Sequence, residues 1–182
     1  FVGSRGLGDV YKRQFTTKGR YLPRTAWRDL PIEHVNVNML ELSIRHVPPE
    51  NLVFWMSGQE PAGQRTSNVV YKSDVWIQGK KNQRASTWLD MADMIPEPDR
   101  GVYQIDIRDK DGRARDSARI LLTDMLLVAK TATGGAQDNW AHKAMVWVRD
   151  SHKGTGVSGA EISLVRPSGQ SVARCRTDGE GG

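Results

Sequence analysis

The chain has 182 residues, of which 38% are hydrophobic and 26% charged, with a formal net charge of +5. This length fits one domain or two, and the composition is too apolar for a disordered chain. No run of 18 uncharged apolar residues occurs, which excludes a transmembrane helix. The one cysteine, Cys175, excludes an internal disulfide framework and a cysteine-based zinc finger.

The first fourteen residues, 1–14, read FVGSRGLGDVYKRQ and have no clear hydrophobic period. They resemble the translated read-through of a sequencing-library adapter, a scar found at the ends of metagenomic reading frames, and we set them aside as one would a tag. They carry Arg5, Lys12 and Arg13 against Asp9, which leaves 23 basic and 20 acidic residues, a net charge of +3. The charge therefore gives little support to nucleic-acid binding.

Strand signals follow at short intervals. Apolar residues alternate over 35–39 and alternate again in the opposite phase over 40–44. This change of phase predicts either one long strand with a bulge or two strands bent at 38–40. Alternation also predicts strands over 71–77 and 103–107, each ending at a cluster of turn residues.

One short helix is predicted over Pro49–Ser57, because Pro-Glu opens an apolar stretch that Gly58 closes. A turn is predicted at Pro167–Gly169. Strands are predicted on either side of it and earlier in this half of the chain, at 120–122, 125–129, 144–148, 162–164 and 172–176. Short strands separated by turn residues, without βαβ alternation, are typical of all-β sandwich modules.

The polar stretch 113–117 lacks a hydrophobic period and predicts a boundary between two modules. We expect a β-sandwich over 15–117 and the start of a second one over 118–182. Residues 177–182 form a turn signal with no strand after it. We therefore expect the second sandwich to be truncated at its C-terminus and the chain to be a fragment.

Four histidines are the first candidate metal ligands, and they do not form a metal motif. His34, His46, His142 and His152 are isolated and lack HExxH or HxH spacing. We expect them to be solvated side chains at strand ends.

The stretch Asp109–Gly112 is the second candidate, because it resembles part of a calcium-binding EF-hand loop. Aligning Gly112 with the loop glycine places Ile107 and Ala118 at the first and last ligand positions, where oxygen side chains are required. A hairpin turn is the preferred prediction.

The chain also lacks the common motifs of nucleophilic catalysis and phosphate binding. The serines lack a GxSxG elbow, and the glycine pairs lack the Lys-Ser of a P-loop. Cys175 has no histidine at a suggestive spacing and is expected to be a packed structural thiol. Trp147, one of six tryptophans, lies in an apolar strand and is expected in the core. The sequence predicts no catalytic residue, no cofactor or metal site, and no enzymatic activity.

Three segments together carry a family resemblance. Residues 20–52 contain RYLPR, LPIEHVNVN and RHVPPENL, and residues 119–130 read RILLTDMLLVAK. Residues 146–164 contain VWVRDSHKG and VSGAEISL, and TDG follows at 177–179. This order resembles the bacterial alpha-2-macroglobulins, in the large variant built from many macroglobulin-like domains. The family usually has a proline in its GxPVxGA turn, where this chain has Gly156.

The resemblance implies tandem macroglobulin-like antiparallel β-sandwiches of the immunoglobulin or fibronectin type. It implies a periplasmic inhibitor of endopeptidases, anchored to the inner membrane through a lipidated N-terminus outside this chain. Its partners would be proteases, met by the full-length protein, and neighbouring macroglobulin-like domains, with no nucleic acid. Some members capture proteases through a thioester in a Cys-x-Glu-Gln motif. Cys175 is followed by Arg176, Thr177 and Asp178, so it is not that cysteine.

The leading hypothesis is that the chain forms two consecutive scaffold domains of a protease-trapping inhibitor and carries no catalysis. The alternative is an immunoglobulin-like array of a cell-surface adhesin or invasin-like protein. A third hypothesis is a partner of cell-wall enzymes. Further macroglobulin-like domains after the last residue would favour the first hypothesis, whereas near-identical repeats or an anchoring signal would favour the second.

Overall fold

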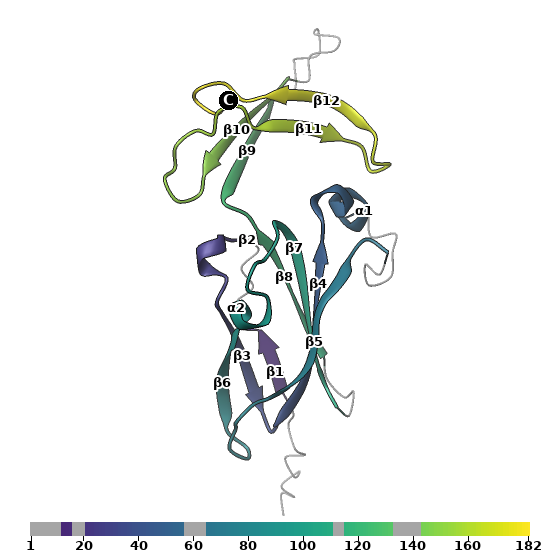
Figure 1. The fold of residues 1–182 in the computed structure, drawn as a ribbon, viewed down its shortest axis with the longest axis vertical. Coiled ribbons are helices and arrows are strands. Elements are labelled where there is room, and N and C mark those ends of the chain that lie inside the picture. The colour runs from purple at the N-terminus through teal and green to yellow at the C-terminus, as the bar shows by residue number, and fades with distance from the viewer. Residues whose placement is uncertain (1–11, 16–20, 57–64, 111–114, 133–142) are drawn as a thin grey trace, which may run out of the picture. The chain divides into compact units, whose positions relative to one another are not determined.

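The chain divides into two compact units, residues 1–122 and residues 123–182, in a computed structural model (Figure 1). The structure describes residues 12–15, 21–56, 65–110, 115–132 and 143–182. Strands dominate both units, and the described helices are short. This confirms the predicted all-β class.

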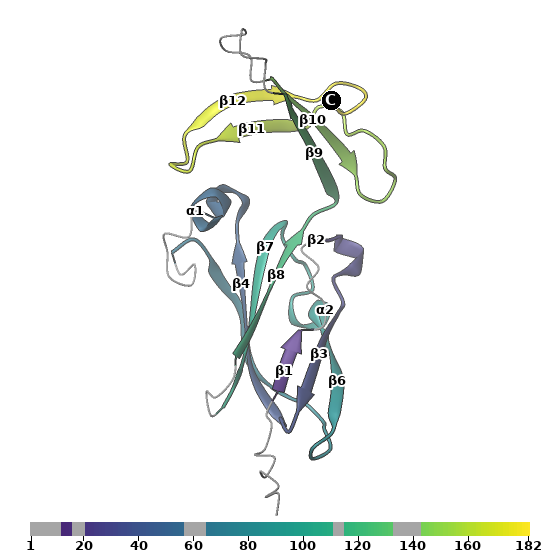
Figure 2. The same ribbon diagram turned by 180° about the vertical axis from the view of Figure 1, so that it is seen from behind.

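Unit 1 is a sandwich of two sheets, which Figure 1 and Figure 2 show from opposite sides. One sheet has the order β1-β3-β6, from strands β1 (Lys12–Phe15), β3 (Asp29–Val35) and β6 (Arg84–Asp90). The other has the order β2-β8-β7-β4-β5, from strands β2 (Tyr21–Leu22), β4 (Met39–Val47), β5 (Asn68–Trp76), β7 (Gly101–Asp109) and β8 (Arg115–Leu122). The strands pair antiparallel except β2 and β8, which make a short parallel contact.

The core of unit 1 lies between these sheets and comes from strict alternation. On β4 and β7, Leu42 and Ile44 lie opposite Ile107 and Ile105, and all four side chains are fully buried. Ile32 of β3, in the three-stranded sheet, belongs to the same buried hydrophobic cluster. Burial of each such side chain stabilises the fold by about 1.5–3 kcal/mol.

The phase change near residue 38 marks the point where the chain passes from one sheet to the other. β3 ends at Val35 in the three-stranded sheet, and β4 begins at Met39 in the five-stranded sheet. Asn36 adopts a positive φ of 57° between them and exchanges hydrogen bonds with Asn82, whose φ is 60°. The two-strand interpretation is therefore correct, although residues 36–38 form the turn.

The predicted helix at Pro49–Ser57 is confirmed over its described residues. A 3-10 turn, η2 (Pro49–Asn51), leads into α1 (Leu52–Met56), where the Arg119 guanidinium lies 4.9 Å from the Trp55 ring centre. Two further short helices, η1 (Arg24–Ala26) and α2 (Met91–Met94), were not predicted.

The unit boundary differs from the expected 117/118, because residues 118–122 complete β8. Leu122 pairs with Gly101 of β7 and is fully buried in unit 1. Residues 115–117 of the polar stretch are the first residues of β8, where Asp116 pairs with Ile107 and Ser117 pairs with Asp106 of β7, and residues 113 and 114 lie outside the described residues. The stretch lacks an apolar period because these first residues of β8 are polar and not buried, although they pair in the sheet.

Of the segment 1–14, which is predicted to be a library scar, residues 1–11 lie outside the described residues. Residues 12–14 open β1, whose backbone pairs with β3, and the Phe15 N–H donates to Asp116 Oδ2 of β8 at 2.9 Å. Backbone pairing accepts any side chain. The origin of residues 1–14 therefore stays a prediction.

Unit 2 contains two antiparallel ribbons. β9 (Met125–Ala132) pairs with β10 (Lys143–Asp150), and β11 (Glu161–Val165) pairs with β12 (Ser171–Arg176). These confirm the strands predicted at 125–129, 144–148, 162–164 and 172–176, whereas the one predicted at 120–122 is the end of β8 in unit 1. The turn at Pro167–Gly169 joins β11 to β12, with Gly169 at a φ of 84°. Among the described residues of both units, no helix has the length and apolar character to cross a membrane.

Candidate functional site

Two of the four histidines are core residues rather than solvated side chains. His34 of β3 is 1% exposed, and its Nε2 lies 2.9 Å from Thr87 Oγ1. His46 of β4 is 8% exposed, and its Nε2 lies 3.0 Å from the backbone oxygen of Arg100. The expectation is wrong for both because they occupy inward positions of their strands. His34 follows buried Ile32 by two residues, a signal that alternation alone provides.

The environment of His34 favours the neutral ring. Burial lowers the pKa of His34 below its ordinary value. Its Nδ1 is buried without a hydrogen-bond partner. This fits the neutral tautomer in which Nε2 carries the proton and donates to Thr87, because Nδ1 then bears a lone pair and has no proton to donate. This histidine is therefore a packed side chain with one satisfied nitrogen.

An aromatic cluster lies beside His46 in the core of unit 1. The Tyr103 ring centre lies 4.8 Å from that of His46 and 4.5 Å from that of Trp27. The Tyr103 hydroxyl donates to the Asp99 carbonyl at 2.9 Å, and burial raises the pKa of Tyr103 to about 12. Trp27 donates to the Ile95 carbonyl at 3.1 Å. Sequence analysis missed this cluster, which fixes the segment before β7.

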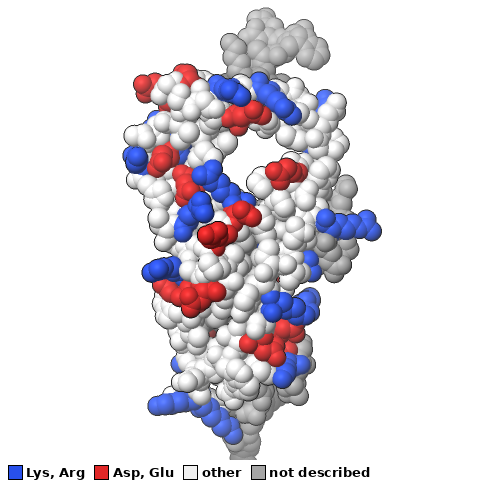
Figure 3. Space-filling model, viewed as in Figure 1, with Lys and Arg blue, Asp and Glu red and all other residues white. Residues whose placement is uncertain are grey.

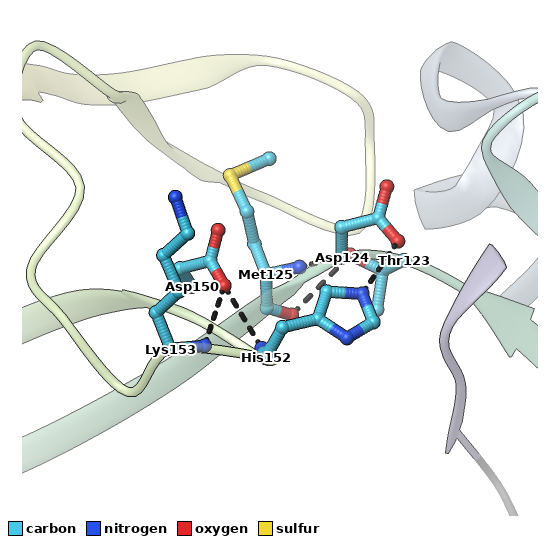
Figure 4. A network of polar contacts seen from close by, with 6 residues as sticks. All are labelled: Thr123, Asp124, Met125, Asp150, His152 and Lys153. Atoms are coloured by element: carbon cyan, nitrogen blue, oxygen red, sulfur yellow. Dashed lines mark hydrogen bonds and ion pairs between the residues drawn. The ribbon is translucent and has the colours of Figure 1, made fainter. Parts of the chain in front are cut away.

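His152 belongs to a polar network at the start of unit 2 (Figure 4). The Asp150 carboxylate accepts hydrogen bonds from the N–H groups of Lys153 and His152, at 2.9 and 2.8 Å, and these bonds lower the pKa of Asp150. His152 Nε2 lies 3.6 Å from Asp124 Oδ1. The backbone oxygen of Asp124 also accepts from the N–H of Ser151. The network fastens the loop after β10 to the first residues before β9.

A second set of buried polar contacts involves Thr177, which is 5% exposed. Its hydroxyl accepts from the Ala160 N–H at 2.9 Å and donates to the Val157 carbonyl at 2.5 Å. The next residue, Asp178, accepts from the N–H groups of Gly182 and Glu180, and both bonds lower its pKa. The TDG signal is thus a turn whose side chains hold unit 2 together.

Glycine is required where this turn meets the segment after β10. A Cβ on Gly156 would lie 2.1 Å from the Glu180 carbonyl oxygen. Gly181 has a φ of +83°, and its Cβ would lie 2.5 Å from the Val148 carbonyl oxygen. Gly156 replaces the usual proline of the pattern at a point of backbone contact.

Charged side chains line a shallow groove of about 270 Å³ on the outer face of the five-stranded sheet. Glu41 pairs with Lys72 at 3.0 Å, and Asp106 accepts from Gln104. The other lining residues are Ser43, Arg45, Val69 and Arg108. Figure 3 shows acidic and basic side chains interspersed on one face. Such exposed pairs typically contribute under about 1 kcal/mol each.

Cys175 is an exposed free thiol, so the expectation of a packed thiol is wrong. The reason is that every residue of β12 is exposed on both faces of its ribbon. Trp147, expected in the core, is half-buried on β10.

His142 and the Asp111–Gly112 part of the calcium-loop candidate lie outside the described residues. Within the described ranges, no three His, Cys, Asp or Glu side chains gather as a metal site.

A family model described as the bacterial alpha-2 macroglobulin MG2 domain matches residues 14–115, more than half of the chain. The chain belongs to the bacterial alpha-2-macroglobulin family. The curated alpha-2-macroglobulin of Escherichia coli (strain K12) is 22% identical over an alignment of 180 positions, which covers 92% of this chain and 10% of the relative. The chain thus spans about a tenth of the length of that relative.

Solved structures of alpha-2-macroglobulins have the same fold. Native E. coli alpha-2-macroglobulin spanning domains NIE-MG1 aligns with a TM-score of 0.72 at 20% identity, covering 96% of this chain and 86% of that one. Trypsin-activated alpha-2-macroglobulin from E. coli aligns with a TM-score of 0.65 at 19% identity, covering 93% of this chain and 13% of that one. The chain therefore has the fold of macroglobulin-like β-sandwich domains, and the predicted family is confirmed.

Proposed function

We propose that this chain forms two consecutive scaffold domains of a protease-trapping alpha-2-macroglobulin and contributes no catalytic group. The observation that carries the proposal is the family match over residues 14–115, which lies on a tightly packed sandwich. A relative of the same fold has been crystallised in a trypsin-activated form. The partners would be proteases, reached through the full-length protein, and neighbouring macroglobulin-like domains.

The buried polar side chains of both units form hydrogen bonds within their own unit, as expected for a structural domain. His34 and His46 bond to Thr87 and to a backbone carbonyl, and Thr177 joins two segments of unit 2. These side chains hold the sandwich rather than converge on an open cleft. A trap that rearranges around its target needs domains that move as rigid bodies, and close-packed sandwiches supply them.

The proposed location is the periplasm, with the full-length protein held at the inner membrane by a lipid outside this chain. We retain the division at 117/118 as a prediction of where the native domains meet, with the observed units dividing at 122/123. The first domain is proposed to be a whole sandwich and the second to be the start of the next.

The test is a chimera in which this chain replaces the matching segment of the E. coli alpha-2-macroglobulin. Trypsin is added, and cleavage of a small peptide substrate and of a large protein substrate is followed in parallel. Trapping leaves the small substrate cleavable and protects the large one. We expect the chimera to protect the large substrate, because a scaffold domain is replaced by one of the same fold.

The isolated chain is the matched control, and it should protect neither substrate. Selective protection by the isolated chain would contradict the scaffold proposal. A folded chimera that loses protection would show that the replaced segment of the relative does more than support its neighbours.

A further inference from the structure

Two arginines lie directly opposite each other on the outer face of the five-stranded sheet in unit 1. Arg108 of β7 and Arg115 of β8 are register partners, and both are exposed. Both also belong to residues 14–115, the part of the chain that the family model matches. Like charges at directly opposite positions of a sheet destabilise the pairing, whereas opposite charges stabilise it. The sequence therefore places a repulsive pair where a salt bridge would have favoured the fold.

The carboxylates beside this arginine pair are held by other side chains. Glu41 lies opposite Arg108 on β4, and its Oε1 lies 3.0 Å from Lys72 Nζ. Asp106 lies on the same face two positions before Arg108, and its two oxygens accept from Gln104 Nε2 at 3.3 and 3.2 Å. Within the described part of the chain, neither arginine of the pair has an ion-pair partner.

The other two arginines of this face differ from the pair because their side chains have partners. The Arg119 guanidinium lies 4.9 Å from the Trp55 ring centre, and Arg45 Nη1 donates to Ser67 Oγ at 3.4 Å. Arg108 instead lines the groove of about 270 Å³, which leaves space beside it for a bound group. Uncompensated positive charge on this face is therefore concentrated at the pair.

We propose that Arg108 and Arg115 together bind a doubly charged phosphate group, either free or as the monoester headgroup of a lipid. Each guanidinium is a planar fork that donates two parallel hydrogen bonds to an oxyanion. The Cβ atoms of opposite residues lie only about 4.5–5.5 Å apart, so two forks can hold different oxygens of one tetrahedral anion. A dianion neutralises both guanidinium groups, whereas a single carboxylate leaves one unpaired. The proposal does not depend on the scaffold role.

The test follows the arginine side chains of the nitrogen-15-labelled chain by NMR while inorganic phosphate is added at about pH 8, where most of it is doubly charged. Sodium acetate is the singly charged comparison, and sodium chloride keeps the ionic strength constant. We expect the Nε–H signals of Arg108 and Arg115 to shift together. They should saturate at about tenfold lower concentration of phosphate than of acetate, because only phosphate engages both forks.

Single variants show whether both arginines are needed. Arg108→Gln and Arg115→Gln each remove one fork at an exposed position, and each should weaken phosphate binding about tenfold while acetate binding changes little. The double variant Lys80→Gln and Lys81→Gln is the matched control. It removes two exposed positive charges elsewhere in unit 1 and should leave phosphate binding unchanged.

Vesicles distinguish the two sources of the phosphate group. The chain is sedimented with phosphatidylcholine vesicles that contain phosphatidic acid, whose headgroup is a phosphate monoester. Vesicles that contain phosphatidylglycerol, whose phosphate is a singly charged diester, are the control. Preferential sedimentation with phosphatidic acid that is lost in Arg115→Gln would assign the group to a lipid. Binding of inorganic phosphate without this preference would assign it to a free phosphate.

Three results would overturn the proposal. Equal affinity for phosphate and acetate would show that the pair does not select a dianion. Shifts of equal size at the other exposed arginines of the chain would show a general attraction to positive charge. Unchanged phosphate binding in both Arg108→Gln and Arg115→Gln would place any bound phosphate elsewhere on the molecule.

Discussion

The Cα of Gly156 and the backbone of Gly181 approach so closely that a Cβ on Gly181 would lie 2.8 Å from that Cα. The contact brings the turn after β12 onto the segment after β10, and the Val148 N–H donates to the Gly181 carbonyl at 2.7 Å. Two glycines distant in sequence therefore close unit 2.

Substitution of either glycine should destabilise unit 2. Gly156→Ala places a methyl group against the Glu180 carbonyl, and Gly181→Ala adds the strain of a positive φ. We expect a loss of roughly 1–3 kcal/mol in the free energy of unfolding for each. Gly179→Ala is the matched control, because its Cβ would meet nothing within 4 Å. If urea unfolding shows that Gly179→Ala loses as much unfolding free energy as the other two variants, the close contact between Gly156 and Gly181 is not what makes glycine necessary there.

The Thr177 hydroxyl should matter more than its methyl group. Thr177→Val keeps the shape but leaves the Ala160 N–H and the Val157 carbonyl without their partner. We expect a loss of about 1–3 kcal/mol. Thr177→Ser retains the hydroxyl and should recover most of it. Hydrogen exchange at Ala160 reports the bond directly, and unchanged protection in Thr177→Val would refute this account.

Unit 1 should lose stability as the pH falls below the ordinary pKa of histidine, about 6.5. Burial lowers the pKa of His34, so the folded unit holds the neutral ring while the unfolded chain takes up a proton. Above about pH 6.5 the ring is neutral in both states and costs no stability. As the pH falls from there to the lower pKa of His34 in the folded state, the unfolded chain binds the proton more readily and the free energy of unfolding decreases. His34→Gln removes the titration. Urea midpoints measured between pH 7.5 and 5 should fall less steeply in this variant than in the unchanged chain.

The two units should respond separately to core changes. Leu42→Ala removes a fully buried side chain from the centre of unit 1 and should cost about 2–5 kcal/mol there. Hydrogen exchange should accelerate in β4 and β7 while β9 and β10 keep their protection. Equal acceleration in both units would mean that they unfold as one.

Alternation predicted β4 and β7 well because each buries one face and exposes the other. It failed for β3, whose inward residues include His34 and whose outward residues include Pro31, so the apolar pattern is broken on both faces. β6 was missed for the same reason, since Trp88 is an outward and exposed residue. The family was recognisable from short segments, and alternation from Ile32 could have indicated the inward position of His34. The exposure of Cys175 depends on what packs against β12, which no local pattern contains.

The hydrogen bond from Phe15 to Asp116 spans 101 positions of the chain. It ties β1 to β8, and β8 pairs with β7, which in turn pairs with β4. During synthesis, β1 and β4 must therefore wait for β8 and β7, which come later in the chain, before these contacts can form. Long-range pairing of this kind places folding in the slow range of all-β proteins, roughly milliseconds to seconds. A nascent unit 1 that ended before Arg115 would expose the open edge of β7, a surface that can pair with strands of other chains.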